Sequence, residues 1–224
     1  MPNFSGIWTV TQQMQAKGQS IWPDPPLVIG QVYGGGYFAG QIGVGGVATH
    51  NLVVGPVASA QSGTLQWKNA NTATPGADSV IDGPQNTADM VANGNSTVYP
   101  CAHFCNDLVI GGFSDWYMPA KNELEVCYYN LKPTTTSNNT NAGTNTNAVP
   151  SRGSNYTAGN PAQTSSADFQ STGAEDFAAV YYWSSTEAST TDAWPQNFST
   201  GLQTYGGYAK PSSYRVRAVR RVAV

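Results

Sequence analysis

The sequence has few charged residues and few histidines, and each scarcity excludes a class of protein. Charged residues make up 10% of the 224 positions and the formal net charge is −3, so there is no basic surface to neutralise nucleic-acid phosphates. Two histidines, His50 and His103, cannot build a histidine-rich metal site. We therefore expect no nucleic-acid partner and no structural zinc.

Cysteine is also scarce. Three cysteines are too few, and odd in number, for a disulfide framework. Cys101 and Cys105 do not have the spacing of a zinc ribbon. We expect these two and Cys127 to be buried free thiols, with a disulfide as the alternative.

Long apolar runs are missing, since no segment approaches the roughly 18 apolar residues of a membrane span. The N-terminal MPNFSGIWTV lacks a positive region followed by an apolar stretch, so we expect neither a signal peptide nor membrane insertion. What replaces charge is Gly, Ser, Thr, Asn and Gln, together with 12 Tyr and 6 Trp. Such a mixture is typical of a contact surface.

The first 30 residues differ from the rest of the chain. Residues 5–20 place Trp8, Val10 and Met14 among glutamines, which predicts a short amphipathic helix, and the prolines of WPDPP end it. We interpret residues 1–30 as an attachment or oligomerisation element with a stiff linker. Residues 31–224 are expected to form one domain.

Within that domain, short apolar runs between glycines predict strands at 27–33, 37–45, 49–57 and 64–67. Helices are predicted at 82–93, with Asp82 as the cap, at 99–110 and at 119–131. The segments 177–187, 191–201, 202–210 and 212–222 alternate in the manner of antiparallel strands. The glycine triplet at 34–36 predicts a tight turn, because no Lys-Ser/Thr follows it as in a phosphate loop.

A polar stretch without periodicity, residues 134–172, interrupts this pattern. Ordinary connections span only about 4–6 residues, so such an insertion is either disordered or functional.

Residues 182–189, YWSSTEAS, place three hydroxyls beside a carboxylate. A serine nucleophile needs a base and an orienting acid, yet His50 and His103 have no partner motif and no G-x-S-x-G elbow is present. The sequence contains carboxylate pairs such as Glu187 with Asp192, but it does not give the separation in space that glycoside hydrolysis requires of two carboxylates. We expect no catalytic residue and no enzymatic activity.

Several motifs together resemble a known domain family. DGPQNTADM, CAHFCNDLVIGGFSDWYMPAKNELEVCY, YYWSSTEAS, AWPQNFSTG and YRVRAVRRV follow one another over residues 33–222 in the order seen in the family named after the C-terminal domain of the Lcl adhesin. That family is similar in fold to C-type lectins, formylglycine-generating enzymes and the phage major tropism determinant. The resemblance implies an α+β, C-type lectin-like domain with twisted antiparallel sheets, two or three flanking helices and long loops.

The resemblance also implies which residues form the scaffold. Trp116, Pro119 and Leu124 would belong to it, as would Trp183, Ser184 and Ser185, with Glu123 paired to an arginine. Arg215 and Arg217 would share one face of a strand, and Val216 and Val219 would close the sheet. The reactive cysteines of formylglycine-generating enzymes lie late in the domain, whereas all three cysteines here precede residue 128, which argues against that chemistry.

No cofactor is expected. The E-P-N, Q-P-D and W-N-D signatures of calcium-dependent lectins are missing, and WPQNF at 194–198 matches them only in part. A single structural Ca²⁺ is the alternative, since it would need six to eight oxygen ligands. The late carboxylates that could contribute are Asp168, Glu175, Asp176, Glu187 and Asp192.

The opening residues WTVTQQMQAKGQSIWP resemble segments that precede display domains in phage tail and fibre proteins. We therefore predict a phage virion protein, assembled in the host cytoplasm, that contacts other virion proteins through residues 1–30, forms a homo-oligomer such as a trimer, and binds a host-surface glycan or outer-membrane protein. The alternative is a decoration protein that stabilises the particle without binding a receptor. The predicted ligand-binding residues are Glu187, Trp194, Gln196, Asn197, Tyr205, Tyr208 and Tyr214.

Overall fold

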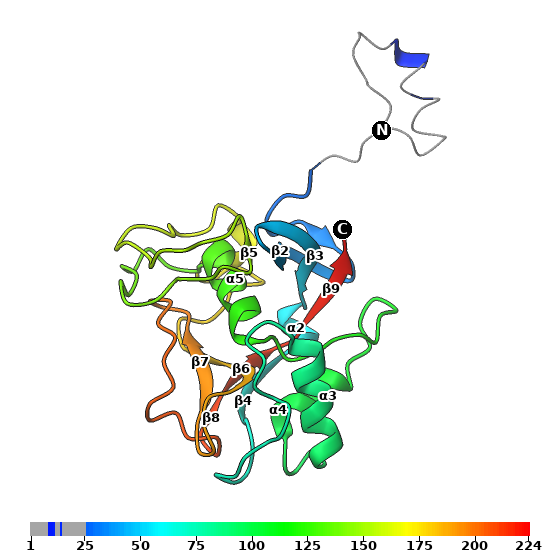
Figure 1. The fold of residues 1–224 in the computed structure, drawn as a ribbon. Helices are drawn as coiled ribbons and strands as arrows, with labels where there is room; N and C mark the ends of the chain where they lie inside the picture. The colour runs from blue at the N-terminus through cyan, green and yellow to red at the C-terminus, as the bar shows by residue number, and fades with distance from the viewer. Residues whose placement is uncertain (1–8, 12–13, 15–25) are drawn as a thin grey trace.

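The computed structural model describes residues 9–11, 14 and 26–224 of the chain. The helix and linker predicted for residues 1–30 therefore lie almost wholly outside the described residues. Residues 26–224 form an α+β domain with two sheets and three helices of seven residues or more (Figure 1). The predicted α+β class is confirmed, and the finer likeness to C-type lectins stays a prediction.

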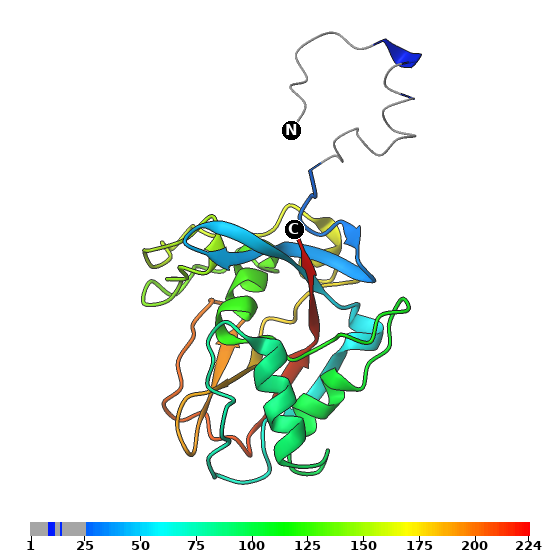
Figure 2. The same ribbon diagram turned by 45° about the vertical axis from the view of Figure 1, so that its right-hand side comes forward.

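The first sheet has the strand order β1-β2-β3-β9, and β5 pairs with β2. These strands are β1 (Val32–Tyr33), β2 (Gly36–Val44), β3 (Val47–Val54), β5 (Ala148–Val149) and β9 (Val219–Ala223). β2 and β3 form a hairpin that turns at Gly45 and Gly46, both at positive φ, which glycine adopts without strain. Residues near 26 and the C-terminus lie at the same end of the domain (Figures 1 and 2).

The second sheet has the order β4-β8-β6-β7. Its strands are β4 (Gln61–Gln66), β8 (Ser213–Arg217), β6 (Tyr181–Glu187) and β7 (Ala193–Asn197). β4 with β8 and β6 with β7 are antiparallel, but β6 and β8 are parallel, so the predicted antiparallel pairing is wrong for that pair. The reason is topological, because residues 198–212 return the chain to the other side of β6 before β8 begins.

Two further strand predictions are corrected. Residues 202–210 form no strand and make only isolated bridges, Gln196 with Gln203 and Asp192 with Ala209. Val216 and Val219 belong to different sheets, since β8 ends at Arg217 and β9 begins at Val219. A hydrophobic alternation continues through both strands and hides the break at Ala218.

The helices follow their sequence signals closely at their beginnings and less well at their ends. They are α2 (Val57–Ala60), α3 (Gly83–Asn93), α4 (Pro100–Asn106), α5 (Lys121–Leu131) and the 3₁₀ turn η1 (Ala167–Phe169). Asp82 caps α3 as predicted, accepting a hydrogen bond from the Gln85 amide at 3.3 Å. α4 ends at Asn106 and not at residue 110. Ile110 instead pairs with Phe113 across a turn at Gly111 and Gly112, both at positive φ.

The core consists of two clusters of buried side chains. One joins α5 to the inner faces of both sheets through Leu52, Leu124, Tyr128 and Tyr182. The other lies between the sheets and the α3–α4 pair. It includes Trp67, Met90, Trp116 and Trp183, together with Cys101 and Cys105. The three cysteines are buried free thiols, as predicted.

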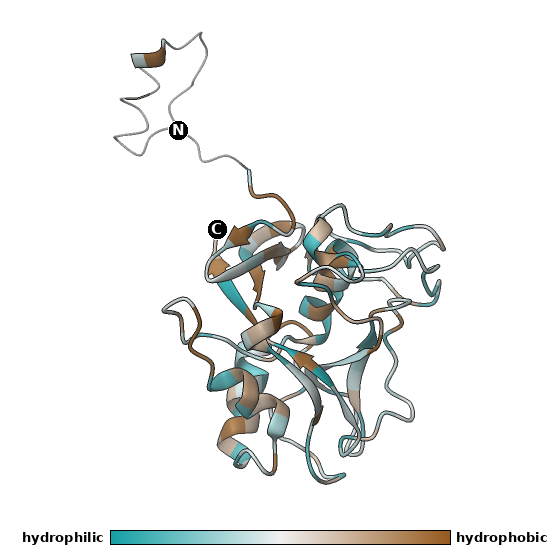
Figure 3. Ribbon diagram, turned by 180° about the vertical axis from the view of Figure 1, so that it is seen from behind, coloured by the Kyte–Doolittle hydropathy of each residue, from teal (hydrophilic) through white to brown (hydrophobic). Residues whose placement is uncertain are grey.

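The insertion at 134–172 is a folded set of loops with little regular structure (Figure 1). Figure 3 shows these loops in pale to teal colours, in keeping with their polar sequence. Buried polar side chains hold them, among them Asn138 and Asn145, which are 6% and 1% exposed. Hydrogen bonds of these side chains add to the hydrophobic contacts of Ala142, Ala148, Tyr156 and Phe169, which the insertion contributes to the core.

Candidate ligand-binding site

The three consecutive hydroxyl groups of β6 all form hydrogen bonds with other parts of the domain. Ser184 donates to the Trp194 carbonyl at 2.6 Å, Ser185 accepts from the Asn86 amide at 3.1 Å, and Thr186 donates to the Ser79 carbonyl at 2.8 Å. All three residues are buried. These hydroxyls connect the strand to β7, to α3 and to the segment before α3.

Neither histidine lies beside these hydroxyls as a base would. His103 Nε2 contacts the Gly94 carbonyl at 2.7 Å, and His50 Nδ1 contacts the Thr49 hydroxyl at 3.0 Å. No group of three or more His, Cys, Asp or Glu side chains suited to a metal ion occurs among the described residues. No helix within the described part of the chain is long and apolar enough to cross a membrane.

Glu187 lies against the scaffold. Its Oε1 accepts a hydrogen bond from Lys210 Nζ at 2.7 Å and its Oε2 accepts one from the Thr74 amide at 2.8 Å. The Lys210 side chain is fully buried and that of Glu187 is 11% exposed. Burial lowers the pKa of Lys210, and Glu187 counteracts this by favouring the charged form. The arrangement indicates a structural ion pair, so we do not place Glu187 among the ligand contacts.

Gln196 and Asn197 shape the turn that follows β7. Gln196 is fully buried, and its side chain bonds with Gln203 and with the Gly201 carbonyl. Asn197 Oδ1 accepts from the amides of Ser199 and Thr200 at 2.7 and 3.2 Å. Both amide side chains therefore fix the loop, and Gln196 is closed to a ligand in this conformation.

Tyr208 and Tyr214 pack with Tyr181 in a half-buried tyrosine cluster. The Tyr208 hydroxyl donates to the Tyr181 hydroxyl at 2.6 Å, and their ring centroids are 4.9 Å apart. Tyr214 also contacts Trp183 at 4.8 Å. Burial and the bond to Tyr181 raise the pKa of Tyr208 above its usual value.

Trp194 and Tyr205 form a separate aromatic pair. Their ring centroids are 4.7 Å apart and their planes meet at 64°. Tyr205 is 46% exposed and Trp194 is half-buried. Neither the Trp194 indole nitrogen nor the Tyr205 hydroxyl makes a hydrogen bond to any residue that the structure describes. The pair thus presents aromatic surface and two unused polar groups.

Lys121 completes this site and was missed by sequence reasoning. Its Nζ lies 4.6 Å from the centre of the Trp194 ring. Among the basic side chains in the described ranges, only Lys121 and Arg215 have neither a hydrogen bond nor an ion pair. Burial lowers the pKa of Lys121, with Glu125 opposing. A lysine at the first position of a helix opposes the helix dipole, and this was the available signal.

The site is held by the surrounding elements. Trp194 lies on β7, Lys121 begins α5, and Gln203 donates to the Lys121 carbonyl at 2.8 Å. The amides at the start of α5 are already bonded, Lys121 N to Thr186 and Asn122 N to the Val80 carbonyl. The polar groups left for a ligand are therefore those of the side chains.

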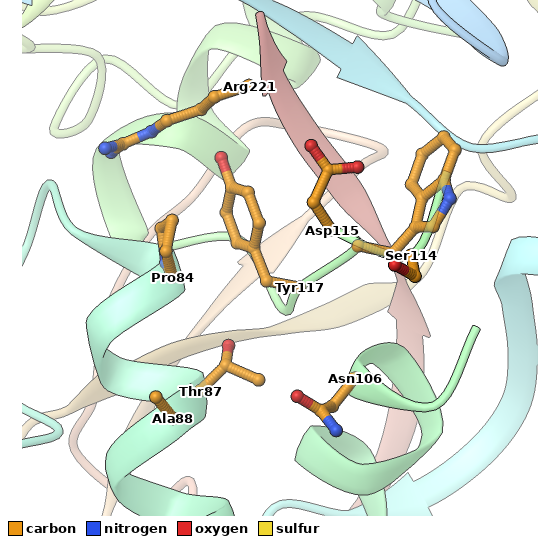
Figure 4. A pocket seen from close by; sticks show the side chains of 9 residues that line it. Pro84, Thr87, Ala88, Asn106, Ser114, Asp115, Tyr117 and Arg221 are labelled. Atoms are coloured by element: carbon orange, nitrogen blue, oxygen red, sulfur yellow. The ribbon is translucent and has the colours of Figure 1, made fainter. Parts of the chain in front are cut away.

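A pocket of about 270 Å³ lies elsewhere, between α3, the end of α4, the DWYMP segment and β9 (Figure 4). Its charged groups are already paired. Both Asp115 oxygens accept from Arg220, at 2.7 and 2.8 Å, and Arg221 donates to Glu123 at 2.7 Å. The predicted pairing of Glu123 with an arginine is confirmed, and these pairs account for the charges of the pocket without a ligand.

Residues 57–220 match the Lcl C-terminal domain family. The chain belongs to this family. The matched residues run from α2 through β8 and contain all four strands of the second sheet. They also include Lys121, Trp194, Tyr205 and the whole insertion. The predicted range of 33–222 was wider, so strands β1 to β3 of this Lcl C-terminal domain protein precede the matched residues.

One solved structure to which the chain is similar is a fimbrial protein from Bacteroides ovatus. It is 14% identical, the alignment covers 75% of this Lcl C-terminal domain protein and 35% of the fimbrial protein, and the TM-score is 0.41. The chain thus spans about a third of the length of that protein. Among curated proteins, none matches the chain.

Proposed function

We propose that this Lcl C-terminal domain protein is a surface-displayed binding module whose aromatic pair, Trp194 and Tyr205, stacks on a sugar of a host-surface glycan. The observation that carries the proposal is the pair of an exposed Tyr205 with a half-buried Trp194, with an unpaired lysine beside it. Aromatic rings contribute large contact area with few rotatable bonds, so little conformational entropy is lost on binding.

The polar groups around the pair suit a sugar. Trp194 Nε1 and Lys121 Nζ are donors, and the Tyr205 hydroxyl is a donor and an acceptor. Sugar hydroxyls offer both functions beside an apolar ring face. A ligand that stacks on the rings can therefore be oriented by these three groups, which have no other hydrogen-bond partner among the described residues.

The position of the site in the domain supports display. Residues 198–212 lie along one side of the domain, whereas residues near 26 and the C-terminus meet at another end (Figures 1 and 2). A domain attached through residues 1–30 would leave that side free. We propose attachment to a phage virion, as a homo-oligomer such as a trimer, with no catalytic activity.

Binding of the purified chain to host cells and to a glycan array tests the proposal. Wild-type protein is compared with Trp194→Ala and with Phe113→Ala, a control that removes another exposed ring, 37% exposed, far along the chain from the site. We expect Trp194→Ala to lose at least about tenfold in affinity, as at a binding hot spot, and Phe113→Ala to bind as wild type.

Three results are informative. Binding to cells but to no glycan, still dependent on Trp194, would identify a protein ligand such as an outer-membrane protein. Binding that is insensitive to Trp194 would refute the site. No binding to cells or glycans, with particles adsorbing normally without residues 31–224, would favour the decoration protein.

A further inference from the structure

We propose that the insertion at 134–172 is the second half of the recognition surface, and that the two halves together bind an uncharged oligosaccharide. This inference rests on the proposed function of the aromatic pair. It assigns to the insertion a role in specificity and names the class of ligand.

The insertion lies directly beside the turn that leads to Tyr205. The Asn139 amide donates to the Thr200 carbonyl at 2.8 Å. Gly201 approaches the rings of Tyr128 and Tyr156 so closely that a Cβ there would lie 2.3 Å from the first and 2.7 Å from the second. The loops of the insertion and residues 198–212 lie along the same side of the domain in three views (Figures 1, 2 and 3).

Buried polar groups on α5 and just after it hold the insertion in place. Glu125 of α5 is 1% exposed and accepts hydrogen bonds from Tyr156 at 2.6 Å, from Asn145 at 2.5 Å and from Arg152. The Arg152 guanidinium also stacks on the Tyr129 ring at 3.9 Å. A second anchor is Asn138, and a third is Lys132, whose Nζ donates to the Thr136 carbonyl at 2.6 Å.

Two loop tips, residues 139–144 and 151–160, form part of the exposed surface of the insertion and are joined to each other. Asn155 accepts from the Thr144 hydroxyl at 2.9 Å and donates to the Thr140 carbonyl at 3.0 Å. The exposed side chains of Asn141 and Asn160 make no hydrogen bond to any described residue. Two amide groups are thus held on ordered loops with their hydrogen-bonding capacity unused.

Charge decides the class of ligand. Arg152 is the single charged residue in the two tips, and its guanidinium is turned inward to Glu125. Short amides and hydroxyls on an uncharged surface complement sugar hydroxyls, whereas a polyanion would find only one unpaired cation across the two halves, Lys121 beside Trp194. Since the aromatic pair and the tips belong to different loops, we expect the ligand that contacts both to be a chain of several sugars.

The test uses the full chain and a panel of uncharged hexasaccharides, built from glucose, mannose or N-acetylglucosamine, together with their monosaccharides and hyaluronan fragments. The variant is Asn141→Ala/Asn160→Ala. The control is Asn93→Ala, which changes an exposed asparagine on α3. We expect wild type to bind an uncharged hexasaccharide more tightly than its monosaccharide. The double variant should weaken the hexasaccharide at least about fivefold, leave the monosaccharide unchanged, and keep the wild-type melting temperature.

Several results would overturn the inference. An unchanged hexasaccharide affinity in the double variant, with Trp194→Ala still losing binding, would remove the insertion from the site and leave the proposed function intact. The inference would also be wrong if the wild type bound only hyaluronan, or bound cells through Trp194 but bound no glycan. Loss of Trp194 dependence on cells would refute the proposed function itself.

Discussion

The ring of Tyr205 lies 4.7 Å from the indole of Trp194, on a loop that leaves β7 and returns beside it. Because Tyr205 is 46% exposed, its ring can be removed with little loss of packing. We expect Tyr205→Ala to weaken ligand binding about tenfold, or about 1.4 kcal/mol, and Tyr205→Phe to stay within about twofold. Titration calorimetry with the ligand found on the array measures both. Equal losses in the two variants would show that the hydroxyl, and not the ring, makes the contact.

Glu187→Ala should destabilise the fold. The substitution leaves Lys210 fully buried without its carboxylate, and breaking such a pair costs about 3 kcal/mol. Urea unfolding followed by tryptophan fluorescence measures the loss. Adding Lys210→Met should recover part of the stability, since no buried charge then remains. A Glu187→Ala protein of wild-type stability that fails to bind ligand would restore Glu187 as a ligand contact.

Glu125→Gln should loosen the insertion selectively. The carboxylate accepts from Asn145, Arg152 and Tyr156, all within 134–172, and the amide cannot accept all three bonds. We expect a loss of about 2–4 kcal/mol and faster hydrogen exchange at amides such as Tyr156.

Glu123→Gln is the matched control for this variant. Glu123 is equally buried on α5, but it bonds Tyr117 and Arg221, which lie outside the insertion. It should cost stability and leave exchange in 134–172 unchanged. Equal exchange in both variants would contradict a selective role for Glu125.

Asp115→Asn should remove part of the acid sensitivity of the fold. Hydrogen bonds from Arg220 lower the pKa of Asp115 below its usual value near 3.8, although partial burial opposes them. A lowered folded-state pKa means that this stabilisation is present above pH 3.8 and is lost as the pH falls through the folded value. The wild type should therefore lose more stability than Asp115→Asn between about pH 4 and pH 2 in urea unfolding. Parallel pH profiles would show that the pair does not contribute.

Local signals were sufficient for much of the fold. Asp82 predicted the start of α3, and Pro119 predicted that a helix begins close after it. The resemblance of the YWSST motif predicted that Trp183, Ser184 and Ser185 belong to the scaffold, and they are buried. The predicted site was less secure. The aromatic residues lie in the predicted region, but an alternating pattern cannot distinguish Trp194 and Tyr205 from tyrosines packed against one another. Glu187 showed the same limit, because Lys210 lies 23 positions away in the sequence. Gln196 is buried because the loop after β7 folds Gly201 and Gln203 back onto it.

The sequence by itself determined the composition of the surface, the family, the beginnings of α3, α4 and α5 and the free state of the cysteines, because each depends on local pattern or on residue counts. The tertiary structure decided what long-range contacts control. It paired Lys210 with Glu187 across 23 positions, inserted β8 parallel to β6, and folded the insertion around Glu125. It also placed an unpaired Lys121 beside Trp194. A charged or polar side chain becomes structural or available to a ligand only through the partners that folding brings to it.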